Sequence, residues 1–290
     1  MTEAPHRILT ITCPDGPGIV AAVSGCLADH GANILAAAQF GDATTGCFFQ
    51  RIVFETRPNI AAEADFARVF TPVASHFAMD WHFHDAAAPL KTVIAVSGQG
   101  HCLNDLLHRC RTGDMPIDVT AVVSNHEDMR RLTEWHDIPY HYIPMPKGPT
   151  EEIKAEREAQ ILALMEETGA ELLVLARYMQ ILTAPTCDRL AGRAINIHHA
   201  FLPGFKGARP YTRAHERGVK IIGATAHYVT ANLDEGPIIE QAVERVDHTL
   251  TPDDMMSIGR DTECTVLARA VRWHAERRVL LNGSKTVVFR

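Results

Sequence analysis

From Lys91 onward, short apolar runs alternate with stretches of helical periodicity, and this alternation constrains the fold more than any other feature. Thr150, followed by Glu151 and Glu152, is a typical start for a long helix. The sequence predicts strands at 92–96, 119–123, 172–176, around 196 and at 221–228, and helices at 102–111, 129–136, 151–167 and 255–278. Such alternation predicts a doubly wound, mainly parallel α/β domain, which we assign to residues 91–290.

The first 85 residues follow a different pattern. The run 14–18 is a dense turn signal, apolar residues at helical spacing follow it, and Gly31 is predicted to end that helix. Strands are predicted at 7–13, 33–40, 48–55 and 79–84, and helices at 19–27 and 61–77. The order βαββαβ predicts a ferredoxin-like sandwich over residues 1–85. The proline-marked segment 85–90 is the predicted linker between the two domains.

The overall composition narrows the classes of partner. The 290 residues give room for two domains, and the contents of 46% hydrophobic and 22% charged residues are ordinary for a globular protein. A net charge of −7 with no basic block argues against nucleic acid as a partner. No apolar run is long enough for a membrane span, and residues 1–5 lack a signal-peptide pattern. The seven scattered cysteines favour reduced thiols and a cytoplasmic location.

Three polar residues stand out in the second domain. Asn196 and His198 are two positions apart on a predicted strand, so their side chains point to the same side of the sheet. They lie near the C-terminal end of that strand, where ligands bind in open α/β sheets. Asp234 lies in a turn between Asn232 and Gly236, and we expect it to meet the other two in space. Taken singly, each residue is more often structural than catalytic, because Asn and His satisfy local hydrogen bonds and Asp favours turns.

The turn at 15–20 resembles the ACT family of small-molecule-sensing domains, and Asn33 fits the same pattern. A helix N-terminus offers unpaired N–H groups to a carboxylate, which gives the resemblance a physical basis. The resemblance implies self-association into a homo-oligomer. It leaves open whether the loop binds an amino-acid effector or only mediates assembly. The candidate effector residues are Asp15, Gly16, Gly18, Ile19 and Asn33.

Several motifs between about 91 and 246 resemble the folate-dependent formyltransferase family. They agree in order and spacing: the strand with Asn196 and His198 before Leu202-Pro203, an acidic loop with Asp234, a second histidine at His227, and a folate-lining segment at 175–182. The resemblance implies that Asn196, His198 and Asp234 are catalytic. It implies substrate-binding roles for Arg177, Tyr178, Met179, Gln180, Ile181, Leu182, His227, Gly236 and Pro237.

One hydrolytic subgroup of this family has an ACT-like domain before the formyltransferase-like domain, as this chain does. The segment 101–107 and the pair His198-His199 also resemble that subgroup. That resemblance implies hydrolysis of the substrate 10-formyltetrahydrofolate to tetrahydrofolate and formate, which adjusts one-carbon folate pools and bears on purine biosynthesis. In such a reaction Asn196 and His198 donate hydrogen bonds to the developing oxyanion, and Asp234 orients the histidine and takes a proton from water. Direct attack by water requires no cofactor, and no metal-site spacing is present.

Two departures keep alternatives open. Ala200 stands where the family commonly has serine, and Cys102 replaces the asparagine that usually follows the glycine-rich turn 97–100. In transferases that turn cradles a phosphate of the amine acceptor. The acceptor therefore stays open between water and an amine, with a formyltransferase as the alternative. A non-catalytic folate or amino-acid sensor is a third hypothesis, against which the intact trio of Asn196, His198 and Asp234 speaks.

Overall fold

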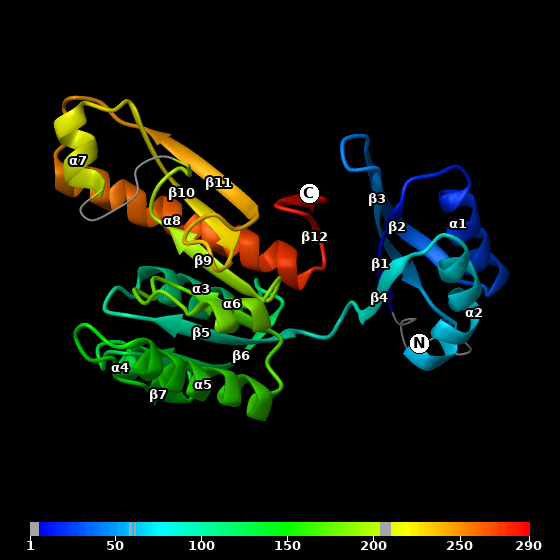
Figure 1. The fold of residues 1–290 in the computed structure, drawn as a ribbon, viewed down its shortest axis with the longest axis horizontal. Coiled ribbons are helices and arrows are strands. Elements are labelled where there is room, and N and C mark those ends of the chain that lie inside the picture. Colours follow the sequence, from blue (N-terminus) through cyan, green and yellow to red (C-terminus); the bar gives the residue numbers. More distant parts are fainter. Residues whose placement is uncertain (1–5, 58–59, 61, 204–209) are drawn as a thin grey trace. The chain divides into compact units, whose positions relative to one another are not determined.

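The computed structural model describes residues 6–57, 60, 62–203 and 210–290 (Figure 1). The chain divides into two compact units. Unit 1 comprises Met1–Ala88 together with Glu276–Arg290, and unit 2 comprises Pro89–Ala275. Within the described ranges, no helix is both long enough and apolar enough to span a bilayer.

Unit 1 has the predicted βαββαβ order. Its four strands form an antiparallel sheet in the order β2-β3-β1-β4, and the apolar faces of both helices pack on it around Phe54, Phe66 and Phe70. Gly31, at a φ of 74°, follows the first helix as predicted. The elements are β1 (His6–Pro14), α1 (Ile19–Asp29), β2 (Asn33–Asp42), β3 (Cys47–Glu55), α2 (Glu63–His76) and β4 (Asp80–Asp85).

The last fifteen residues belong to unit 1, whereas the sequence assigned them to the second domain. They form a hairpin of β12 (Val279–Asn282) and β13 (Lys285–Val288). The Arg51 guanidinium donates to the carbonyl of Glu276 at 2.9 and 3.1 Å, and the Asn282 amide donates to Asp42 at 2.7 Å. These contacts join positions more than 220 residues apart, which local periodicity cannot reveal.

Unit 2 is a seven-stranded sheet in the order β11-β10-β9-β8-β5-β6-β7. The five strands from β9 to β7 are parallel, and β10 runs antiparallel to both β9 and β11. The strands are β5 (Leu90–Val96), β6 (Ile117–Ser124), β7 (Tyr140–Tyr142), β8 (Leu172–Leu175), β9 (Ala194–His198), β10 (Ile221–Tyr228) and β11 (Ile238–Arg245). The predicted doubly wound, mainly parallel sheet is confirmed, although the sequence did not predict β7 and β11.

Helices cover both faces of this sheet (Figure 1). They are α3 (His101–Arg111), α4 (Arg130–Glu134), α5 (Glu151–Thr168), α6 (Ala184–Arg189), α7 (Pro210–Arg217) and α8 (Pro252–Ala275). The predicted cap of α5 is present, because the Thr150 hydroxyl accepts from the N–H of Ile153. The sequence missed the short helices α6 and α7, and it extended α8 three residues too far.

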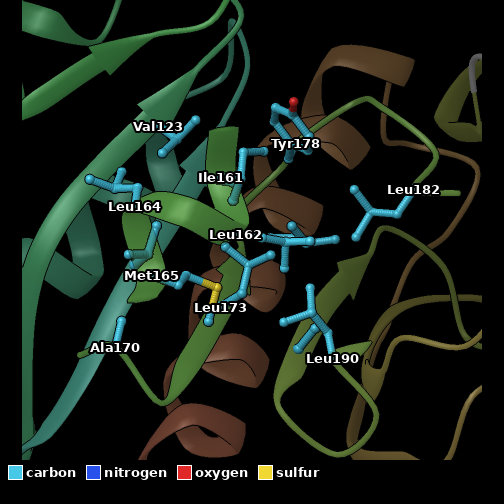
Figure 2. Packing of buried hydrophobic residues seen from close by; sticks show 14 of the residues in the cluster. Val123, Ile161, Leu162, Leu164, Met165, Ala170, Leu173, Tyr178, Leu182 and Leu190 are labelled. Atoms are coloured by element: carbon cyan, nitrogen blue, oxygen red, sulfur yellow. The ribbon is translucent and has the colours of Figure 1, made fainter. Parts of the chain in front are cut away.

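The core between α5, α6 and the sheet fixes the end of β8. Figure 2 shows Ile161, Leu162 and Met165 of α5 packing towards Leu173 and Leu190. Beside this core, the buried Glu158 carboxylate accepts hydrogen bonds from the N–H and hydroxyl of Thr183, at 3.0 and 2.5 Å. This anchored carboxylate holds the far end of the irregular segment that follows β8, and that segment lines the cleft described next.

Candidate active site

The predicted pair on β9 lies where this strand ends beside β10. Asn196 and His198 face the same side, and the register places His227 of β10 opposite Asn196. The Asn196 side-chain nitrogen lies 3.3 Å from Nε2 of His227. His227 Nδ1 lies 2.9 Å from the carbonyl oxygen of Tyr228, so Nδ1 carries a proton and donates it. The side chains of Asn196 and His227 are thus held against one another.

Asp234 reaches both histidines from the turn that precedes β11. Its carboxylate lies 3.3 Å from His198 Nδ1 and 3.7 Å from His227 Nε2. Asp234 has a φ of 56°, which aspartate tolerates better than most residues. A Cβ on Gly236 would overlap the carbonyl oxygen of Tyr228, so only glycine lets the turn lie this close to β10. The turn thus brings Asn196, His198 and Asp234 into one cluster with His227.

The charges in this cluster are set by burial and by these contacts. Burial alone would raise the pKa of Asp234, but the hydrogen bonds and charges of His198 and His227 hold that pKa well below its ordinary value. Asp234 is therefore an anion at neutral pH. His198 is only 7% exposed, and its Nε2 has no hydrogen-bond partner within the described part of the chain. A buried, unpaired nitrogen is costly unless a ligand completes it.

A cleft of about 690 Å³ opens beside these residues. One side is apolar and includes Met179 and Ile181, which are 60% and 58% exposed, together with Val229 and Leu233. Such a surface suits a flat aromatic ligand. The cleft is also lined by five further residues to which the sequence assigned substrate-binding roles, Arg177, Tyr178, Gln180, Leu182 and His227. Gly236 and Pro237, which had the same assignment, are not among its described lining residues. These two shape the turn that carries Asp234.

The other side of the cleft is charged, and sequence reasoning missed most of it. Glu263 of α8 is 1% exposed, and its carboxylate lies 2.8 Å from His101 Nε2 and 3.4 Å from Arg177 Nε. It also accepts from the Tyr211 hydroxyl at 3.0 Å. Burial would raise the pKa of Glu263, but His101 and Arg177 keep it below its ordinary value. No local signal marks Glu263, because it stands in the middle of a helix.

Cys102 adjoins this charged group but is not exposed for reaction. Its sulfur lies within 4.8 Å of ligand atoms of His101 and Glu263, a spacing that could hold a metal ion. The Arg177 guanidinium already supplies a positive charge to Glu263 there. A hydrogen bond with Cys264, together with burial, raises the Cys102 pKa well above its ordinary value, so this thiol stays protonated.

The candidate effector residues lie in unit 1, at the turn before α1, at the first residue of α1 and at the start of β2. Gly18 has a φ of 90° at the N-cap, and Asp15 and Gly16 are exposed. The Asn33 amide donates to Glu55 at 3.4 Å. Ile19 is 1% exposed in the core, so it can offer a ligand only its backbone. The turn therefore presents backbone groups rather than a formed side-chain pocket.

Comparison with known proteins agrees with this architecture. The family model for formyl transferase matches residues 90–271, and the model for the ACT domain matches residues 7–64. The class defined by fold and cleft is therefore a formyl transferase domain preceded by an ACT domain.

Full-length relatives narrow the class. A protein of Corynebacterium sp. strain P-1 named formyltetrahydrofolate deformylase is 49% identical and covers 100% of both chains. The crystal structure of formyltetrahydrofolate deformylase from Burkholderia mallei covers 99% of this chain and 100% of its own at 50% identity, with a TM-score of 0.92. Glycinamide ribonucleotide transformylase 1 from Symbiobacterium toebii covers 71% of this chain and 97% of its own at 29% identity, with a TM-score of 0.63. The chain belongs to the formyltetrahydrofolate deformylase family.

Proposed function

We propose that this protein hydrolyses 10-formyltetrahydrofolate to tetrahydrofolate and formate. The observation that carries the proposal is the pairing of His198 Nδ1 with Asp234 while His198 Nε2 is buried without a described partner. Relatives named for this activity match the chain from end to end. The apolar side of the cleft, with Met179, Ile181 and Leu233, suits the flat ring system of a folate.

In the proposed mechanism, the formyl oxygen lies against the Asn196 amide and His198 Nε2. Attack by water places negative charge on that oxygen, and both groups can donate hydrogen bonds to it when His198 is protonated. His227 holds the Asn196 amide at 3.3 Å and so fixes its direction. The anionic Asp234 stabilises the imidazolium of His198 and can take the proton of the attacking water.

Collapse of the tetrahedral intermediate breaks the bond between the formyl carbon and N10 of the folate. N10 takes up a proton, and the formyl carbon leaves with two oxygens as formate. Each step is an addition of water or a proton transfer, so we propose that no cofactor is required. Such a hydrolase would supply formate and adjust the one-carbon folate pools that feed purine biosynthesis.

An amine formyltransferase is the alternative, and the full-length match to deformylases does not favour it. Formate release from 10-formyltetrahydrofolate should proceed without any amine, and added glycinamide should leave its rate unchanged. Release that becomes measurable only after an amine is supplied would contradict the hydrolase.

For unit 1 we propose an amino-acid effector at the turn of Asp15 to Gly18, and self-association of the chain into a homo-oligomer through this unit. The support is the match to the ACT domain and the N–H groups at the start of α1. Static light scattering at micromolar concentration tests the assembly, and a monomer would contradict it.

We also propose a cytoplasmic location, because all seven cysteines are described and none forms a disulfide.

A further inference from the structure

Arg177 is held in a backbone conformation that disfavours it. Its φ is 64°, in the left-handed region where glycine is the least strained residue. The residue is nevertheless well ordered by contacts, since its carbonyl accepts from the N–H of Ser97 at 3.2 Å. Non-glycine residues in this region are strained, and they concentrate at functional sites. The Arg177 side chain must therefore contribute something that glycine could not.

The Arg177 guanidinium joins three elements on the charged side of the cleft. It donates to Gln99 Oε1 from Nε and Nη2 at 3.3 and 3.1 Å, and its Nη1 lies 2.9 Å from His199 Nδ1. Its Nε also lies 3.4 Å from the Glu263 carboxylate. We call Gln99, Arg177, His199 and Glu263 the arginine cluster. Its Arg177 side chain is 11% exposed, and that of Glu263 only 2%.

The arginine cluster lies directly beside the proposed catalytic histidine. The ring of His199 stacks on that of His198, with centroids 4.8 Å apart and planes inclined by 20°. Because arginine can only donate, His199 Nδ1 accepts from it. The cluster thus fixes the orientation of the ring that stacks on His198.

The position of the cluster bears on which nucleophile can reach the formyl carbon. If the folate ring lies against the apolar residues Met179, Ile181 and Leu233, the arginine cluster is the part of the cleft lining left for a second substrate. There the Gln99 side chain, from the glycine-rich turn between β5 and α3, is tied to Arg177, and the guanidinium is itself held by the buried Glu263 carboxylate, so these side chains bind one another rather than an acceptor. Water needs neither room nor a binding site of this kind.

We propose that Arg177 is a specificity-determining residue, which closes the acceptor side of the cleft through the arginine cluster and confines the reaction to water. This inference rests on the proposed hydrolase function. With the cluster opened, a small amine can attack the formyl carbon instead. The bond from that carbon to N10 then breaks, N10 takes the proton that the amine nitrogen loses, and the products are an N-formyl amine and tetrahydrofolate.

The test is Arg177→Gly in the full chain, because glycine relieves the backbone strain while removing the guanidinium. Wild type and variant are incubated with 10-formyltetrahydrofolate and glycinamide, and mass spectrometry measures N-formylglycinamide against formate. We expect the ratio of amide to formate to rise by about tenfold or more in the variant. Ethylguanidinium added at millimolar concentration should lower the ratio again, which a general loosening of the fold would not produce.

Two further variants keep the inference open to refutation. Gln99→Ala alters an exposed turn and frees the same guanidinium, so a smaller rise is expected. Arg269→Ala removes an exposed arginine of the same helix as Glu263, α8, that is not among the described residues lining the cleft, and the ratio should stay at the wild-type value. An unchanged ratio in both Arg177→Gly and Gln99→Ala would overturn the inference. Absence of formate release by wild type would instead overturn the proposed function.

Discussion

Asp234→Asn isolates the charge of one carboxylate from its shape. Asparagine tolerates a φ near 56° about as well as aspartate, so the turn should keep its backbone. The variant retains a side-chain oxygen towards His198 but loses the negative charge. We expect kcat to fall strongly while KM changes little, because the negative charge of Asp234 stabilises the His198 imidazolium that donates to the oxyanion.

The size of the loss follows from the distance. Unit charges 3.3 Å apart interact by about 5 kcal/mol at an effective dielectric constant of about 20. The remaining amide dipole and water that enters the cluster recover part of this energy. A net loss of about 3–4 kcal/mol remains, which corresponds to a fall in kcat of about 100- to 1,000-fold.

Steady-state formate release over a range of 10-formyltetrahydrofolate concentrations gives kcat and KM, and folate binding is measured separately by calorimetry. Asp247→Asn is the matched control, because Asp247 also accepts hydrogen bonds within a loop, from Thr249 at 2.6 and 2.8 Å. A variant that binds folate poorly but turns over at the wild-type rate would refute the proposed role of Asp234.

Three other outcomes are expected. Gly236→Ala should lower the free energy of unfolding by about 2 kcal/mol in urea denaturation, because the new methyl group overlaps the Tyr228 carbonyl oxygen. The control Gly25→Ala should not lower it, because the space around Gly25 is open. Burial, then the charges of Arg277 and His82, lower the pKa of His84 from 6.5 to about 4, so between these pH values the unfolded chain binds a proton that the folded chain does not. The Tm of unit 1, measured by calorimetry, should therefore fall as the pH is lowered from 6.5 towards 4, and it should fall less steeply in His84→Gln. Equal slopes for the two proteins would contradict this. An amino acid should bind the full chain in titration calorimetry, and Asp15→Ala should weaken that binding; no heat with any of the twenty would remove the proposed effector site.

The sequence determined the fold class, because periodicity and turn residues act locally. The βαββαβ order of unit 1, the Thr150 cap and the long α5 and α8 were all predictable from neighbouring residues. The short β7, α6 and α7 were not, since three to eight residues carry too little periodic signal. The sequence also did not predict that the C-terminal hairpin belongs to unit 1, because the residues that bind this segment, Asp42 and Arg51, lie more than 220 positions before it.

For the cleft, the sequence by itself predicted that Asn196, His198 and Asp234 meet, because each lies in a motif with a recognisable pattern of residues. Only the tertiary structure revealed Glu263, which reaches Arg177 and His101 from a helix that begins 75 residues after Arg177. The physical reason is that a buried charge is tolerated only where folding brings its partners to it, and those partners lie on separate elements. Sequence pattern thus predicted which polar groups meet in the cleft, and packing decided which charges surround them.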